Sequence, residues 1–158
     1  MIPLTLAELK NKEFVLRTDR DGSLCDVDHR LRILIADDLP DSIFLLTRML
    51  NLVGYENIQT AASGTEVLSA THRYEFDAIL LNWEMPGMTG IETLRVLKKN
   101  RVMAFIAIVT AHAMKTHKDQ CIEAGFDAVI TKPFSSLDLR KALGHLRRRP
   151  DETNLDAF

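Results

Sequence analysis

The most informative part of the chain runs from residue 78 to residue 90 and reads Ala78-Ile79-Leu80-Leu81-Asn82-Trp83-Glu84-Met85-Pro86-Gly87-Met88-Thr89-Gly90. A short uninterrupted apolar run of this kind is typical of a strand that is buried on both faces of a sheet. The Met-Pro-Gly segment that follows predicts a tight loop, because proline presets one backbone angle and glycine tolerates turn conformations. A polar side chain, Asn82, therefore stands where the buried strand ends.

Outward from this stretch, short apolar runs alternate with helical patterns of roughly 10–14 residues from residue 31 onward. Five strand–helix units in succession predict an α/β fold with a five-stranded parallel sheet, doubly wound, with helices on both faces. The predicted strands are Arg32–Ala36, Ile58–Ala61, Ala78–Leu81, Ala104–Thr110 and Ala128–Thr131. The predicted helices are Asp41–Val53, one that opens with a capping box at Ser63, Ile91–Lys99, Ala113–Ala124 and one that follows Ser136.

The composition indicates one globular domain with short extensions. The chain has 158 residues, of which 46% are hydrophobic and 27% are charged, and this suits a single domain with an apolar core and a polar surface. We expect residues 31–149 to form this domain and residues 150–158 to form a C-terminal tail. We expect residues 1–30 to form an N-terminal extension with a short helix and a possible hairpin, interpreted either as a packing appendage or partly disordered arm, or as an element for homodimerisation or partner docking.

Charge and hydropathy exclude several classes of partner. The net charge of −2 provides no field that would attract nucleic acid or an anionic membrane. The apolar runs are too short to span a bilayer, and the N-terminus lacks the pattern of a signal peptide. The two cysteines, Cys25 and Cys121, lack metal-type spacing and suit reduced thiols. We therefore expect a cytoplasmic protein that binds neither nucleic acid nor membrane.

Polar residues also stand at the ends of the other predicted strands. Asp37 and Asp38 follow the first, Thr110 ends the fourth and Lys132 follows the fifth. Ligands of open parallel sheets bind beyond the carboxyl ends of the strands. Adjacent carboxylates at such an edge favour a divalent cation, with Mg2+ the natural candidate, and a hydroxyl and an ammonium group suit a phosphoryl group. The sequence thus predicts a cation- and phosphate-handling site with Asn82 at its centre.

These motifs resemble the receiver domain of bacterial two-component response regulators, in particular the single-domain chemotaxis-type regulators. The resemblance covers about residues 31–148 and rests on four motifs: Ile33–Asp38, Trp83–Gly90, Val109–Ala111 and Thr131–Phe134. It implies that the acidic pair and residue 82 bind Mg2+ with the backbone carbonyl of Glu84. It also implies that residue 82 is the phosphoacceptor position, that the threonine and lysine sense the phosphate, and that the peptide bond before Pro133 is cis.

The resemblance implies partners as well. A sensor histidine kinase or a phosphotransfer protein would supply the signal. A downstream protein would receive it on the face built by residues 113–124, the strand 128–131 and the helix after Ser136. We expect signalling by protein–protein contact and no enzymatic activity.

Two positions depart from the family pattern. Asn82 replaces the acceptor aspartate; a carboxamide is a far poorer nucleophile than a carboxylate, and the loss of one negative charge should weaken Mg2+ binding. Val129 stands where many family members carry a tyrosine or phenylalanine that reports activation. Because the other site residues are intact, we interpret Asn82 as a deliberate Asp→Asn substitution that traps the unphosphorylated state. The alternative is a natural receiver that signals without phosphorylation.

An enzyme is the competing class. A Mg2+-dependent aspartyl phosphatase also uses aspartates at strand ends, but it places them one residue apart after the first strand, whereas Asp37 and Asp38 are adjacent. We interpret the remaining polar groups as surface features: His112 and His117 on the fourth predicted helix, and Arg147–Arg149 at the end of the last one.

Overall fold

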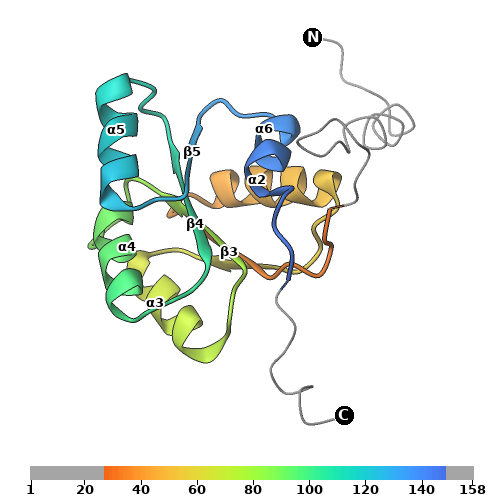
Figure 1. Ribbon diagram of the computed structural model, residues 1–158, viewed down its shortest axis with the longest axis horizontal. Helices are drawn as coiled ribbons and strands as arrows, with labels where there is room; N and C mark the ends of the chain where they lie inside the picture. The colour runs from red at the N-terminus through yellow and green to blue at the C-terminus, as the bar shows by residue number, and fades with distance from the viewer. Residues whose placement is uncertain (1–26, 149–158) are drawn as a thin grey trace.

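The computed structural model describes residues 27–148, which form a five-stranded parallel sheet between two layers of helices (Figure 1). The sheet order is β2-β1-β3-β4-β5, and every neighbouring pair is parallel, so the predicted fold class is confirmed. The strands are β1 (Ile33–Ala36), β2 (Ile58–Ala61), β3 (Ala78–Asn82), β4 (Phe105–Thr110) and β5 (Ala128–Thr131). The helices are α2 (Pro40–Val53), α3 (Gly64–Arg73), α4 (Gly90–Lys99), α5 (Lys115–Ala124) and α6 (Ser136–Leu143).

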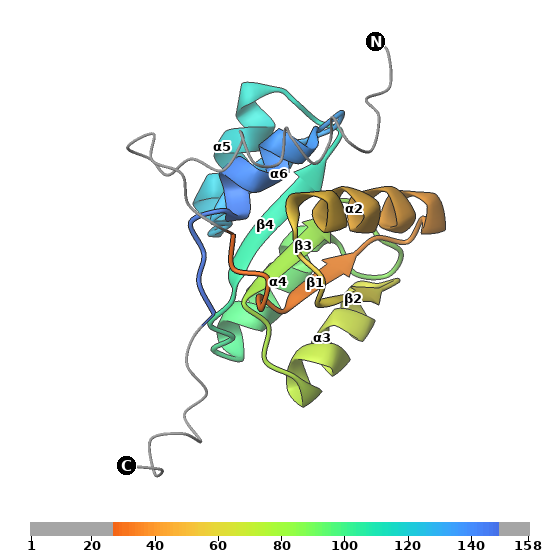
Figure 2. The same ribbon diagram turned by 90° about the vertical axis from the view of Figure 1, so that its right-hand side faces the viewer.

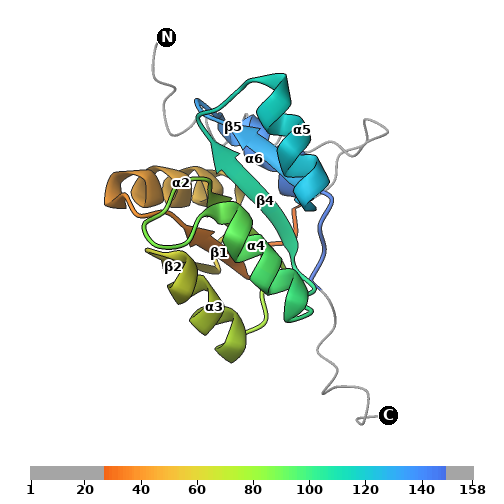
Figure 3. The same cartoon turned by 90° about the vertical axis from the view of Figure 1, so that its left-hand side faces the viewer.

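The sheet separates two hydrophobic cores. Successive side chains of a strand point to opposite faces, so in β1 Ile33 and Ile35 join one core while Leu34 and Ala36 join the other. The first core includes buried leucines of α2 and α6, and the second includes buried residues of α3, α4 and α5. Figures 2 and 3, which view the molecule from opposite sides, show these two layers of helices in turn. Burial on both faces explains why the strand runs are almost entirely apolar.

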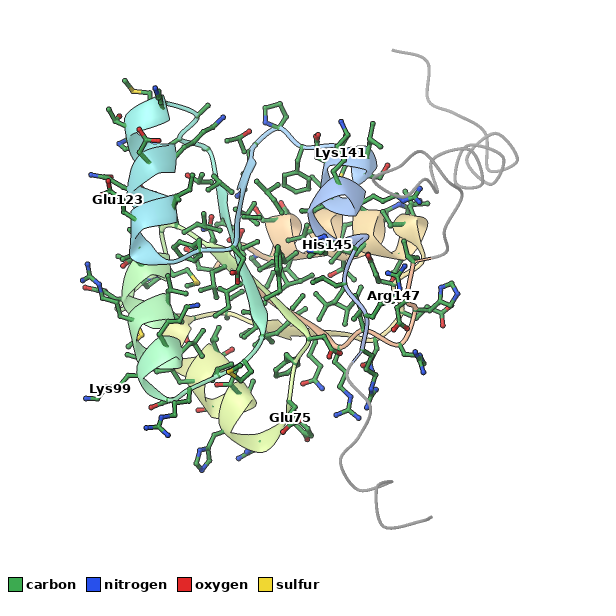
Figure 4. The ribbon with its side chains drawn as sticks, in the orientation of Figure 1. Glu75, Lys99, Glu123, Lys141, His145 and Arg147 are labelled. Carbon is green, nitrogen blue, oxygen red and sulfur yellow. The ribbon has the colours of Figure 1, made fainter. Side chains whose placement is uncertain are left out.

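The outer faces of the helices carry the charged side chains. In Figure 4 the labelled Lys99 and Glu123 project away from the sheet, from the end of α4 and from α5. Between residues 27 and 148, no helix is both long enough and apolar enough to cross a membrane.

Local signals account for most helix boundaries. Helix α2 begins at Pro40, one residue earlier than predicted, because proline is well suited to the first turn of a helix. It ends as predicted at Gly54, whose φ of 119° lies in the left-handed region. At α3, Ser63 accepts a hydrogen bond from the N–H of Glu66, but the Glu66 carboxylate accepts from the N–H of Ala62, so the predicted capping box is only half formed.

The fourth helix begins two residues later than the predicted start at about Ala113. Helix α5 begins at Lys115, and Met114 before it has an extended backbone with ψ of 141°. The segment is held out of the helix because the N–H of His112 donates to the hydroxyl of Thr110. His112 therefore lies in the β4–α5 loop and not on the helix, whereas His117 lies on α5 as predicted.

Asp28 links the two ends of the described chain. Its carboxylate accepts hydrogen bonds from the side chain of Arg30 and, across the fold, from the backbone N–H of Arg148 at 2.8 Å. The hydrogen bonds from Arg30 are the main reason why the pKa of Asp28 lies well below its usual range. The predicted short helix, the hairpin, Cys25, Arg149 and the tail all lie outside the described residues.

Candidate functional site

The predicted site residues lie at the carboxyl edge of the sheet. The strand order reverses direction between β1 and β3, and ligand sites of open α/β sheets form at such a reversal. Asp37 follows β1 directly and is tied to β2, because its backbone N–H donates to the carbonyl of Ala61. Asn82 ends β3 beside it. The topology thus brings together two residues that are 45 positions apart in sequence.

Asp37 is the buried centre of the site. Its Oδ1 accepts a hydrogen bond from the backbone N–H of Leu39 at 3.0 Å, and the amide nitrogen of Asn82 lies 3.5 Å from the same oxygen. Its Oδ2 lies 3.6 Å from the ammonium nitrogen of Lys132. The negative charge of Asp37 is therefore already partly compensated by groups of the protein itself.

The Asn82 side chain points its nitrogen into this site. Nδ2 donates to the backbone carbonyl of Glu84 at 2.7 Å, in addition to its longer contact with Asp37. Both neighbours are acceptors, so the opposite orientation would face the amide oxygen toward a carbonyl and a carboxylate and would be repulsive. The amide N–H groups thus face the two oxygen groups from which a cation ligand set would be built.

Thr110 and Lys132 are joined through the backbone of Thr110. The N–H of Lys132 donates to the carbonyl of Thr110 at 2.8 Å. The Thr110 hydroxyl is buried and accepts from the N–H of His112 at 3.0 Å, so it holds the β4–α5 loop. The peptide bond between Lys132 and Pro133 is cis, as the family resemblance implies.

Asp38 is the predicted site residue that remains apart. It is exposed, and among residues 27–148 it forms no hydrogen bond or ion pair. Of the four residues predicted to surround Asn82, the structure therefore brings Asp37 and Lys132 into direct side-chain contact, and leaves Asp38 in solvent and Thr110 turned to the loop.

Close packing fixes the backbone just beyond β3. A Cβ added at Gly90 would lie 2.6 Å from the carbonyl oxygen of Asn82, so α4 can start this close to the strand end only with glycine. The N–H of Gly90 also donates to the carbonyl of Trp83 at 2.9 Å. Gly87, with φ of 80°, makes the predicted tight turn. Helix α4 is then secured by a full capping box between Thr89 and Glu92.

A cluster of side chains next to the site was not predicted. The ring of Trp83 contacts those of His112 and His117, with centroids 6.0 and 5.6 Å away, and the two histidine rings are 4.9 Å apart. Nε2 of His112 lies 3.4 Å from Oε1 of Glu84. These contacts join the loops after β3 and β4. The sequence contained one signal for this cluster: the two loops follow strands that are neighbours in the sheet, so the residues just after each strand end lie side by side.

The donor set is of the kind that suits Mg2+. Two carboxylates, the Glu84 carbonyl and the amide oxygen of Asn82 are hard oxygen ligands, and Mg2+ commonly uses one or two carboxylates together with water. Residues 27–148 contain no cluster of three or more histidine, cysteine or acidic side chains that could hold a metal. To offer its oxygen, Asn82 would first have to give up its hydrogen bond to Glu84. The residues therefore fit the ion by type, and the Asn82 amide nitrogen occupies the Glu84 carbonyl in this structure.

Comparison with known proteins agrees with this geometry. The profile of the response regulator receiver domain family matches residues 33–144. The chemotaxis protein CheY of Pseudomonas aeruginosa is 30% identical over 121 residues, which cover 75% of this chain and 98% of that protein. The receiver domain of a Francisella response regulator has a TM-score of 0.67 at 26% identity, covering 72% of this chain and 93% of that one.

A third similar structure bears on the metal. The receiver domain of a Pseudomonas aeruginosa sensor histidine kinase, with a magnesium ion coordinated in its active-site cleft, has a TM-score of 0.63 at 27% identity and covers 72% of this chain and 93% of that one. The chain described here belongs to the response regulator receiver domain family. It is a module of two-component signal transduction, in which receiver domains interact with histidine kinases and downstream effectors.

Proposed function

We propose that this chain is a receiver that passes two-component input to a target protein by surface contact, in a form that takes no phosphoryl group at position 82. The observation that carries the proposal is the amide of Asn82 among the otherwise complete site residues Asp37, Asp38, Thr110 and Lys132. We assign the receiver to residues 31–149, flanked by the extension 1–30 and the tail 150–158.

The chemistry of the amide supports this proposal. An acceptor aspartate attacks phosphorus with a carboxylate oxygen as the bond to the donor breaks. The oxygen of a neutral carboxamide is a weak nucleophile, since its electron density is delocalised toward nitrogen. In Asn82 the nitrogen also faces inward, hydrogen bonded to Glu84. Lys132 and the Thr110 hydroxyl, the groups that would neutralise and hold a phosphate, then have no covalent phosphate to bind.

Mg2+ binding should be weak for the same reasons. Asp37, Asp38 and the Glu84 carbonyl would hold the ion, whose role in a receiver is to offset the charge of the incoming phosphoryl group. The contacts of Asp37 with Asn82 and Lys132 supply part of this compensation without metal. We therefore propose that the site keeps the same conformation with and without Mg2+, and that this conformation corresponds to the unphosphorylated state of a receiver.

The output surface is proposed to be the face of α5, β5 and α6. A switch in this family is a population shift between two surface conformations. Here the β4–α5 loop is held by Thr110 and His112 in place of phosphate. Val129, half-buried on β5, packs against the core on the α5 side and supplies no aromatic ring that could rotate. This suits a surface that is held in one state.

The test follows Trp83, the only tryptophan of the chain, whose ring lies beside the site. Its fluorescence would be recorded with Mg2+ and with Mg2+ plus a small phosphodonor such as acetyl phosphate, for the native chain and for Asn82→Asp, with intact-mass measurement of any adduct. We expect a donor-dependent change and a phosphoryl adduct in Asn82→Asp only.

Three outcomes separate the alternatives. A stable phosphoryl adduct on the native chain would overturn the proposal. If Asn82→Asp folds and binds Mg2+ but ignores the phosphodonor, then the chain is a natural receiver that signals without phosphorylation and not a trapped form. Steady release of inorganic phosphate from a phosphomonoester by the native chain would favour the phosphatase alternative instead.

A further inference from the structure

The C-terminal ends of α3 and α4 expose basic and apolar side chains together. Two of these side chains are large and apolar: Tyr74, just after α3, is 50% exposed, and Met103, in the loop after α4, is 70% exposed. Four exposed basic residues accompany them, so that the group consists of Arg73, Tyr74, Lys98, Lys99, Arg101 and Met103. We call this group the amino-edge surface, because both helices end at the edge of the sheet where the strands begin.

Strand pairing brings the two helix ends together. β3 and β4 are neighbours in the sheet, with Ala78 opposite Phe105. The N–H of Phe105 donates to the carbonyl of Asp77 at 2.9 Å, so the segments that lead into these two strands lie side by side. Helices α3 and α4 also contact each other within one layer (Figure 3). Residues after α3 and residues after α4 therefore contribute to one surface.

The positive charge of this surface is not compensated within the described part of the chain. Between residues 27 and 148, none of its four basic side chains forms an ion pair with a carboxylate, whereas Arg30 and Lys132 each do. Glu75 is the acidic residue next to Tyr74 in sequence, and Figure 4 labels it near the end of α3 and Lys99 at the end of α4. Because the whole chain has a net charge of −2, this positive charge is local. It attracts an acidic group of limited extent.

Arg101 has a backbone conformation that favours glycine. Its φ is 59°, in the left-handed region that is unfavourable for a residue with a Cβ. Turns with the same hydrogen bond, from the next N–H to the carbonyl five residues back, follow α2 and α5, and there the residue is Gly54 or Gly125. Stabilisation of the helix end accounts for Lys98 and Lys99, but it does not require an arginine after them. A strained residue kept at an exposed position indicates that its side chain has a role outside the fold.

The residue types of the surface suit a protein partner. Arginine, tyrosine and methionine are enriched where proteins contact each other, and all three are present here. A nucleic acid, by contrast, is bound through many phosphate contacts along a longer basic surface. The amino-edge surface covers only two helix ends, and the rest of the chain carries net negative charge.

We propose that the amino-edge surface binds a short acidic segment of a partner protein. Carboxylates of that segment pair with Lys99 and Arg101, and an apolar side chain of the segment packs against Tyr74 and Met103. This surface lies at the opposite edge of the sheet from Asn82. It therefore goes beyond the function proposed above, because its partner is bound whether or not position 82 can take a phosphoryl group.

Fluorescence anisotropy of the full chain with a labelled peptide tests the proposal. The probe is a synthetic peptide of four Glu-Glu-Leu repeats, and its control has glutamine in place of every glutamate. We expect saturable binding of the acidic peptide and no saturable binding of the control peptide. Raising the salt concentration should weaken the binding, since the contacts are exposed ion pairs.

The key variant combines Lys99→Gln with Arg101→Gly. It should weaken binding about fourfold, because each exposed ion pair contributes a factor of about two. Glycine suits the left-handed turn at position 101, so loss of binding will not result from unfolding, and the urea midpoint provides the check. Arg48→Gln is the matched control, since Arg48 is also exposed but lies on α2, on the other face of the sheet; it should leave the affinity unchanged.

Three results would overturn the proposal. The first is the absence of saturable binding of the acidic peptide to the native chain. The second is equal affinity of the native chain and the key variant. The third is tighter binding of a single-stranded oligonucleotide than of the peptide, lost in the key variant, which would assign the surface to nucleic acid. None of these results bears on the proposal for Asn82, because the two sites lie at opposite edges of the sheet.

Discussion

The substitution Asn82→Asp should make the fold depend on a divalent cation. It replaces an N–H donor to the Glu84 carbonyl by an acceptor, and a lost hydrogen bond costs about 1 kcal/mol. It also sets a second carboxylate near Asp37, where the Asn82 nitrogen now lies 3.5 Å from Oδ1. Two unit charges at that separation repel by about 5 kcal/mol at an effective dielectric constant of about 20.

The net effect should be smaller than the sum of these two contributions. The Lys132 ammonium, 3.6 Å from Oδ2 of Asp37, offsets part of the repulsion, and a carboxylate at position 82 can turn toward water. We therefore expect Asn82→Asp to lower the free energy of unfolding by about 2–3 kcal/mol in the absence of divalent cations. Added Mg2+ should recover most of this loss, about 1.8 kcal/mol when its concentration is 20 times the dissociation constant.

Urea unfolding followed by circular dichroism, in EDTA and in Mg2+, measures both effects. The native chain should respond to Mg2+ by less than about 0.5 kcal/mol at the same concentration. Asn82→Ala is the control, since it removes the amide without adding charge and should be weakly destabilised and insensitive to Mg2+. The reasoning is refuted if Asn82→Asp is as stable as the native chain in EDTA, or if both chains gain equally from Mg2+.

Three further predictions concern other parts of the fold. Asp28→Asn should lower stability by about 1–2 kcal/mol at pH 7. Because Arg30 lowers the pKa of Asp28 in the folded state, this stabilisation is present above about pH 4 and is lost as the pH falls. The urea midpoints of the two chains should therefore converge toward pH 2. A difference that stays constant with pH would contradict this prediction. Gly90→Ala should cost about 2–3 kcal/mol in urea unfolding because its Cβ meets the Asn82 carbonyl, and an unchanged midpoint would show that α4 can move away. Burial raises the pKa of the Cys121 thiol, so peptide mapping should find Cys121 labelled by a thiol reagent only in denaturant.

The general layout of the fold follows from local patterns. Apolar runs such as Ile33–Ala36 and Ala78–Leu81 are too long and too uniform for a half-exposed strand, and the alternation with helices requires parallel pairing. Stop and start signals of one or two residues, such as Gly54 and Pro40, then set helix ends to within a residue or two. These features depend on neighbours in sequence and could therefore be predicted.

The segment 111–114 shows where local patterns fail. Ala113 and Met114 favour a helix by composition, yet α5 begins only at Lys115. The deciding contacts are the hydrogen bond to Thr110 and the approach of the His112 ring to Trp83 and Glu84, which come from another strand end. A preference of a few tenths of a kcal/mol per residue does not prevail over such contacts.

The sequence alone determines that Asp37, Asn82, Thr110 and Lys132 meet at one edge, because each follows a parallel strand and all such ends lie on the same side of the sheet. It also places an amide at position 82. Only the tertiary structure decides which end of that amide faces inward, since the orientation depends on two acceptors, Asp37 and the Glu84 carbonyl, brought together by folding. The direction of each strand can be predicted from the local sequence pattern. The hydrogen-bond partners of the Asn82 amide cannot, because they depend on distances between groups that come together only when the strands pair.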